Sequence, residues 1–280
     1  MANGTRADEI DYQIIGEDLQ AVIITLDPGE AVVAEAGAMM YMREGIDMAT
    51  TLDPNSQGGG LFGKLLQGGK RVLSGDSFFV TLFTNRGPRR SDVAFSAPTP
   101  GKVIPIDLRQ WGGQVIAQKD AFLCAARGTN VTVALNRRIG AGFFGGEGFI
   151  LQRVEGDGLA FLHASGTLVT IDLAAGEQLR VDTGCLVAMQ PSVDYDIRMV
   201  PGIKTALFGG EGLFFVNLTG PGRVVLQTMP FSRLADRIIA ASPRAGGGRR
   251  EESALGLGAV GGMLGGGLGG VVGGLLDGDR

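Results

Sequence analysis

The chain has 280 residues, of which 44% are hydrophobic and 19% charged, a composition typical of a globular protein rather than a disordered one. The formal net charge of −4 leaves no basic excess to neutralise phosphates, so we expect no nucleic-acid partner. Glycine is frequent, at 48 residues against a usual share of about 7%. The polar start MANGTRADEIDYQ does not resemble a signal or transit peptide, which favours the cytoplasm.

Short runs of β-branched and aromatic residues follow one another along most of the chain, each bounded by Gly, Pro, Asp or Asn. In chain order they include residues 19–26, 77–83, 103–108, 167–173 and 213–218. Runs that recur about every 8–12 residues are typical of a β-sandwich or barrel. We therefore predict an all-β fold, with a single domain over residues 8–240.

Helical periodicity is limited to two short segments, residues 61–73 and 231–241. In the first, Leu61, Phe62 and Leu65 would form an apolar face beside basic residues. Such a helix packs on its own domain, the interpretation we favour, or on a partner or a membrane surface. The surrounding GGGLFGKLLQGGK lacks the GxxxxGK[ST] spacing of a phosphate-binding loop, so we expect no nucleotide cofactor.

A turn motif with an acidic residue recurs along the domain. The sequence GGEG occurs at 145–148 and at 209–212, each time before two strand-like runs, and SGDS at 74–77 is a weaker copy. We predict that residues 144–168 and 208–232 form equivalent β-hairpins, with 73–100 as a looser third.

A second motif, a strand, a glycine turn and another strand, surrounds Gly37, Gly128 and Gly184. It alternates with the acidic turns in the same order. The two series together predict three pseudo-repeated β units. We place them at residues 10–100, 101–166 and 167–235.

The acidic residues of these turns are the candidate ligand-binding groups. Asp76, Glu147 and Glu211 occupy matching positions, and we expect their carboxylates to accept backbone N–H groups within the turns. The alternative is that the three converge on a metal ion or a small ligand. Because metal sites recruit several ligand types and the chain has a single histidine, we expect no metal.

No set of residues typical of a catalytic site is evident elsewhere. His163 lies in the apolar run LAFLHASG, and Cys124 and Cys185 lie in similar runs without a CxxC motif. We interpret the histidine as a core or turn residue and both cysteines as buried, reduced thiols. A Ser-His-Asp or Cys-His pair would have to use this one imidazole. We therefore expect no enzymatic activity and no cofactor.

The C-terminal region, residues 241–280, reads as a polar linker followed by an apolar, glycine-rich tail. Residues 254–276 contain no charged side chain and are long enough to span a bilayer if helical. Glycine recurs every fourth residue there, a spacing used for close helix packing, at Gly258, Gly262, Gly266, Gly270 and Gly274. Because glycine opposes helix formation, the tail is disordered, self-associating or membrane-bound, and disorder is the interpretation we favour.

The motifs together resemble the "altered inheritance of mitochondria" family, a bacterial and mitochondrial group of unknown function. The resemblance rests on GGGLFGKLLQGGKRVLSGDSFFVTLFTN, PGKVIPIDL, FFGGEGFILQRVEGDGLAFLHASG, GEQLRVDTGCLVAM and LFGGEGLFFVNLTGPGRVVLQT. It implies a fold like that of the trp RNA-binding attenuation protein, a double-stranded β-helix type with units around a pseudo-threefold axis. It does not imply tryptophan or RNA binding, because function resides in sites and not in folds.

Two functional classes follow from these observations. The first is a non-enzymatic scaffold or interaction protein, expected to be a cytoplasmic homo-oligomer, with a membrane surface or a membrane protein as a candidate partner. The second is a β domain that binds a metal ion or a small ligand through Asp76, Glu147 and Glu211. Convergence of the three carboxylates would favour the second class, and carboxylates that cap backbone groups would favour the first.

Overall fold

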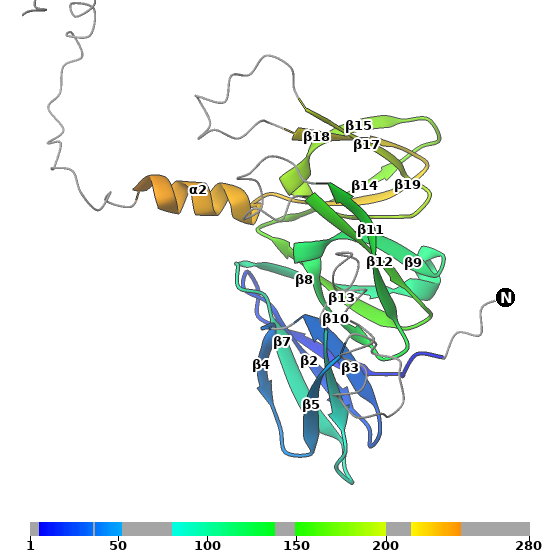
Figure 1. Ribbon diagram of the computed structural model, residues 1–280, viewed down its shortest axis with the longest axis vertical. Helices are drawn as coiled ribbons and strands as arrows, with labels where there is room; N and C mark the ends of the chain where they lie inside the picture. Colours follow the sequence, from blue (N-terminus) through cyan, green and yellow to red (C-terminus); the bar gives the residue numbers. More distant parts are fainter. Residues whose placement is uncertain (1–5, 36, 52–79, 138–148, 200–213, 242–280) are drawn as a thin grey trace, which may run out of the picture. The chain divides into compact units, whose positions relative to one another are not determined.

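The computed structural model describes residues 6–35, 37–51, 80–137, 149–199 and 214–241 (Figure 1). The chain divides into two compact units, Met1–Ala240 and Ala241–Arg280, and the first of them is described below. Its residues form mostly β-strands, which confirms the all-β prediction. The helix predicted at residues 231–241 is also confirmed, as α2 (Phe231–Ala241). The helix predicted at 61–73 lies outside the described residues.

The strands fall into three consecutive segments. The first comprises β1 (Asp11–Ile15), β2 (Ala21–Leu26), β3 (Ala31–Glu35), β4 (Met39–Met42), β5 (Ile46–Thr51), β6 (Val80–Asn85) and β7 (Ser91–Ser96). The second comprises β8 (Gly101–Asp107), η1 (Leu108–Trp111), β9 (Gln114–Gln118), η2 (Lys119–Ala121), β10 (Phe122–Ala126), β11 (Asn130–Arg137), β12 (Phe149–Glu155) and β13 (Leu159–Ser165). The third comprises β14 (Leu168–Leu173), β15 (Gln178–Asp182), η4 (Thr183–Cys185), β16 (Leu186–Met189), β17 (Asp194–Met199), β18 (Phe214–Thr219) and β19 (Gly222–Gln227).

These strands form four antiparallel sheets. Sheet A has the order β1-β2-β7-β4, sheet B the order β5-β6-β3-β10-β13-β8, sheet C the order β11-β12-β9-β16-β19-β14, and sheet D the order β15-β18-β17. Figure 1 labels these strands and colours them in chain order, from blue near the N-terminus to yellow towards the C-terminal strands. Sheets B and C therefore each combine strands of two neighbouring segments.

One order of pairing recurs in all three segments. If the six strands β2–β7, β8–β13 and β14–β19 are each lettered a to f, every segment pairs d-e-b in one sheet and c-f-a in another. Strand b of the first segment, β3, then pairs with strand c of the second, β10. Strand b of the second segment, β9, likewise pairs with strand c of the third, β16. We call these two contacts the inter-segment junctions.

The predicted β-hairpins are wrong in detail. Residues 144–168 contain β12 and β13, but β12 pairs within sheet C and β13 within sheet B. The same holds for β18 and β19, and for β6 and β7. A short turn between these strands carries the chain across to a neighbouring sheet, so strands that are adjacent in sequence face each other through their side chains. Turn residues alone do not distinguish this arrangement from a hairpin.

Three hydrophobic cores lie between the sheets. Phe95 of sheet A and Phe83 of sheet B belong to core 1, and Leu162 of sheet B and Val154 of sheet C belong to core 2. Core 3 contains side chains of sheets C and D, among them Leu186 and Leu218. The strands alternate in side-chain direction, so the shared sheets B and C contribute to a core on each face.

Two of the glycines that the repeat analysis aligned occupy the same turn, and the third does not. Gly37 and Gly184 lie between strands b and c of their segments, whereas Gly128 follows strand c of the second segment. In that segment the b–c turn is the η2 helix Lys119–Ala121, which contains no glycine. The sequence prediction therefore assigned Gly128 to the turn between strands b and c, whereas it lies in the next turn, between strands c and d.

Gly128 and Gly37 form a matched pair for testing backbone constraint. Both have positive φ, +99° and +98°, a conformation that costs an L-residue about 1–2 kcal/mol. A Cβ atom added at Gly37 meets nothing within 4 Å, whereas one added at Gly128 would lie 2.6 Å from the Cα of Ala7. The N-terminal segment packs there, with the Asp8 N–H donating to the carbonyl of Arg127 over 2.9 Å.

We therefore expect Gly37→Ala to lower the free energy of unfolding by about 1–2 kcal/mol. Gly128→Ala should cost about 1–3 kcal/mol more, because residues 6–8 must also be displaced. Urea denaturation of the two variants and the wild type measures both values. Equal losses would show that residues 6–8 do not constrain this turn.

Candidate functional site

The residues predicted as candidate ligand-binding or association sites lie outside the described parts of the chain. This applies to the turn carboxylates Asp76, Glu147 and Glu211, and to the tail glycines Gly258, Gly262, Gly266, Gly270 and Gly274. Within the described ranges, His, Cys, Asp and Glu side chains nowhere gather in a group of three or more that could hold a metal ion. The remaining candidates are the other polar groups and the exposed apolar side chains of the described residues.

His163 lies in the interior of the domain, on strand β13. Its side chain is buried, with 5% of the residue exposed, and its Nε2 atom has no hydrogen-bond partner. Burial lowers the pKa of the imidazole, opposed more weakly by a hydrogen bond with the Thr99 backbone. A Cβ atom added at Gly101 would lie 2.7 Å from Nε2. The ring is thus a packed core group whose burial favours the neutral form.

The two thiols are also poorly suited to chemistry. Cys124 is fully buried and Cys185 half-buried, and both are free. Burial raises the pKa of Cys124 well above its usual value, and burial followed by the charge of Asp182 raises that of Cys185. Because the thiolate is the reactive form, neither cysteine is set up as a nucleophile.

Several carboxylates accept backbone N–H groups in turns, the role predicted for the glutamates of the GGEG motifs. Glu30 accepts from the N–H of Asp27, and Glu177 accepts from the N–H of Ala174, each over 2.8 Å. Both glutamates close the turn between strands a and b of their segments. The sequence carried a signal for them, because each follows a turn glycine in a Gly-Glu pair, but the repeat analysis did not single them out.

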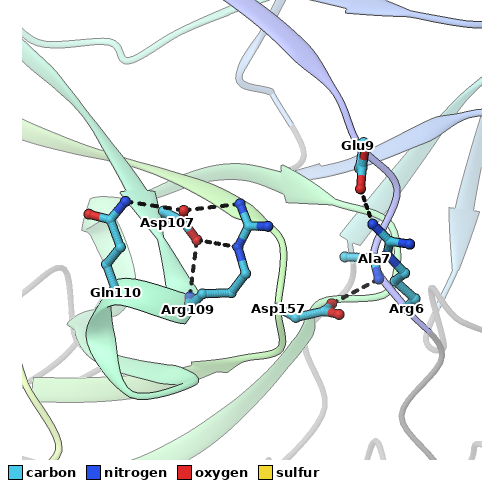
Figure 2. A network of polar contacts seen from close by, with 7 residues as sticks. All are labelled: Arg6, Ala7, Glu9, Asp107, Arg109, Gln110 and Asp157. Atoms are coloured by element: carbon cyan, nitrogen blue, oxygen red, sulfur yellow. Dashed lines mark hydrogen bonds and ion pairs between the residues drawn. The ribbon is translucent and has the colours of Figure 1, made fainter.

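Figure 2 shows a larger polar network on the surface of the second segment. Asp107 caps the η1 helix by accepting the N–H of Arg109 over 3.1 Å, and it also accepts from the Nε and Nη2 atoms of the same arginine over 2.9 and 3.0 Å. Gln110 donates to the second carboxylate oxygen over 3.3 Å. The hydrogen bond from Arg109 lowers the pKa of Asp107.

The same view contains the contacts of the N-terminal segment. Asp157, in the turn between β12 and β13, accepts the N–H of Ala7 over 2.9 Å, and Arg6 pairs with Glu9 (Figure 2). These groups hold a turn and an incoming chain in place. We therefore interpret the network as structural.

Exposed apolar side chains are the remaining feature that points to function. On strand β4, Met40 and Met42 are 49% and 41% exposed, and on helix α2, Phe231 and Ile238 are 58% and 60% exposed. Each element thus presents two large apolar side chains to solvent, and apolar side chains that are exposed together can mark an interaction site. None of the helices in the described ranges has both the length and the hydropathy to span a bilayer.

Comparisons with known proteins place the β domain in a family. The family model described as "Mitochondrial biogenesis AIM24" matches residues 12–229. An uncharacterized protein of Streptococcus pyogenes serotype M6 is 29% identical over 216 residues, which cover 76% of this chain and 83% of the relative. The X-ray crystal structure of a Streptococcus pyogenes protein has a similar fold, with a TM-score of 0.65 at 23% identity, covering 83% of this chain and 99% of the other.

The buried histidine predicts a specific dependence of stability on pH. Since the pKa of folded His163 is lowered, the unfolded chain, with an imidazole pKa of about 6.5, binds a proton that the folded chain does not. Stability should therefore fall as the pH drops below about 6.5, at up to about 1.4 kcal/mol per pH unit from this group.

This dependence can be measured by urea denaturation of the wild type and of His163→Gln between neutral and mildly acidic pH. His163 is the one histidine of the chain, so no other imidazole contributes. The variant should lose less stability on acidification than the wild type. The slopes against pH are compared, because a substitution at this packed site also changes the stability at neutral pH. Identical slopes for both proteins would contradict a neutral, buried His163.

Proposed function

The chain belongs to the mitochondrial biogenesis AIM24 family, and on that basis we propose that it is a non-enzymatic, cytoplasmic scaffold that docks on membrane surfaces through helix α2. The observation that carries the proposal is the exposed apolar stripe of this helix. Phe231 and Ile238 lie seven residues apart, about two helical turns, and so share one face. Leu234, which is half-buried, lies between them on the same face.

The charges of α2 favour an anionic surface. Arg237 is exposed on the side of the helix away from the apolar stripe, and Arg233, four residues earlier on that side, pairs with Asp182 of the β domain. An amphipathic helix with arginines on its polar face and large apolar residues on the other lies in the membrane interface. Each basic residue near an anionic leaflet contributes about 1 kcal/mol.

Helix α2 is fixed to the β domain at its first turn. Arg233 donates to Asp182 over 2.8 Å, and the partly buried carboxylate lies at the end of strand β15. At Gly184 an added Cβ atom would lie 3.1 Å from Pro230 and 3.5 Å from the Ser232 hydroxyl, so the turn approaches the start of the helix closely. The helix is thus held at one end while the side chain of Ile238 stays accessible.

A scaffold agrees better with the chemical groups of the domain than an enzyme does. His163 is buried and neutral, and both thiols have raised pKa values. The carboxylates described above accept hydrogen bonds from turns or from an arginine. The exposed apolar side chains of β4 and α2 have no such structural role, and exposed apolar surface can serve binding.

Flotation with lipid vesicles tests this proposal. We expect the full chain to float with vesicles of phosphatidylcholine and phosphatidylglycerol, and less with phosphatidylcholine alone. Replacing Phe231 and Ile238 together by serine should reduce binding about tenfold or more, because burial of each side chain is worth about 1.5–3 kcal/mol. A matched control replaces Met48 and Val169, which are also exposed apolar residues, by serine.

The control should bind as the wild type does. A chain that ends at Pro243 separates the contribution of the helix from that of the glycine-rich tail, and it should retain charge-dependent binding. Equal flotation of the helix variant and the wild type would contradict a role for α2. Loss of all binding in the shortened chain would assign docking to the tail instead.

A further inference from the structure

Two strands of the described domain lie at sheet edges although their counterparts are paired. Strands β3 and β9, the b strands of the first two segments, each pair with strand c of the following segment. The b strand of the third segment, β15, is the edge of sheet D, and the c strand of the first segment, β4, is the edge of sheet A. The third junction, between β15 and β4, is the one that the chain does not form with itself.

A recurring bulge fixes which residues of the c strands correspond. The register against strand f shifts after the first residue of β4, β10 and β16, between Met39 and Tyr41 in the first case. The equivalent shifts lie between Phe122 and Cys124 and between Leu186 and Ala188. Met40 therefore corresponds to Leu123 and Val187, and Met42 corresponds to Ala125 and Met189.

Burial at these positions differs sharply between the open edge and the two junctions. Met40 is 49% exposed, whereas Leu123 is 2% exposed and Val187 is fully buried. Met42 is 41% exposed, whereas its two counterparts, Ala125 and Met189, are fully buried. Met40 and Met42 thus occupy positions that a neighbouring b strand covers at the two junctions, but in β4 no such strand of the described chain covers them.

The cores show what the position of Met40 contacts in a complete junction. Leu123 belongs to core 1, the core of the segment before its own, and Val187 belongs to core 2, again that of the preceding segment. Met40 lies in the first segment, so its own chain has no preceding segment to receive it. If a second copy supplied its third segment as the preceding one, the side chain of Met40 would enter core 3 of that copy.

Strand β15 offers the complementary edge. Its residue Val181 is buried in core 3, and Leu179 is half-buried. Arg180 is exposed, whereas the residues at the same position of the other two b strands, Val33 and Ile116, are buried. Arg180 is the one departure from an apolar junction, and it donates to Asn217 over 3.2 Å. Its aliphatic stem can still cover an apolar neighbour.

We propose that β15 of one copy pairs with β4 of a second copy, antiparallel and in the register of the two inter-segment junctions. Since Ala34 faces Cys124 and Val33 faces Ala125, the register places Val181 opposite Tyr41 and Arg180 opposite Met42. The pairing joins sheets D and A into one seven-stranded sheet, with the order β17-β18-β15-β4-β7-β2-β1. It joins two different edges, so copies associate head to tail.

This inference goes beyond membrane docking and does not depend on α2. An open edge with exposed methionines is a liability for a monomer, because it invites pairing with other chains. Strand β15 of a second copy matches the β4 edge in strand direction and in register, and core 3 of that copy can receive the side chain of Met40. The two junctions within the chain serve as the template.

Disulfide cross-linking tests the register with two variants, each of which has one introduced cysteine and keeps the buried Cys124. Both carry Cys185→Ser to remove the half-buried thiol, and one has Arg180→Cys while the other, with a distinguishing tag, has Met42→Cys. Co-expressed and mildly oxidised without lipid, they should form a mixed disulfide-linked pair. Neither variant alone should cross-link, and Gln178→Cys with Met42→Cys, two residues out of register, should cross-link far less.

Sedimentation of the unmodified chain supplies an independent measurement. The wild type should sediment as an assembly, and Met40→Lys should shift it to the monomer with an unchanged circular dichroism spectrum. Val169→Lys, at a similarly exposed residue of the β14 edge, should leave the assembly intact. A monomeric wild type, cross-linking of Arg180→Cys with itself, or equal cross-linking out of register would each overturn the proposal.

Discussion

The pairing of one segment's b strand with the next segment's c strand is the interaction on which the rest of the fold depends. It turns two half-sheets into one six-stranded sheet at β3–β10 and again at β9–β16. It also places a residue of the later segment, such as Leu123, in the core of the earlier one. No segment therefore closes its core alone, which explains why neighbouring segments must fold together and why the terminal segments are left with open edges.

The sequence predicted local structure well and the order of the strands poorly. Turn-bounded apolar runs indicated the strands, and the periodicity of residues 231–241 located helix α2. Sheet order depends on contacts between distant residues, such as Val33 with Ala125, which no local pattern encodes. For the same reason the turn between β12 and β13 resembled a hairpin, and Gly128 was aligned with turns that it does not match.

Function was harder to predict because the informative residues are ordinary in sequence and unusual in exposure. Asp76, Glu147 and Glu211 attracted attention by their repeated motif, yet Glu30 and Glu177 are the glutamates seen to cap turns in the described residues. Met40, Met42, Phe231 and Ile238 read as core residues by type. Only their exposure, set against the burial of their structural counterparts where these exist, identifies them as binding surface.

The two proposed surfaces reinforce each other although each can be tested without the other. One α2 helix offers two large apolar side chains and Arg237 to a membrane. Such a contact is worth a few kcal/mol and binds reversibly, as a single acyl chain does. Head-to-tail pairing through β15 and β4 links several such helices into one particle. Once one helix is bound, the next binds at an effective concentration that reaches about millimolar for closely tethered sites. Stable membrane association is then a property of the assembly, and control of assembly at the β4 edge would control where the protein resides.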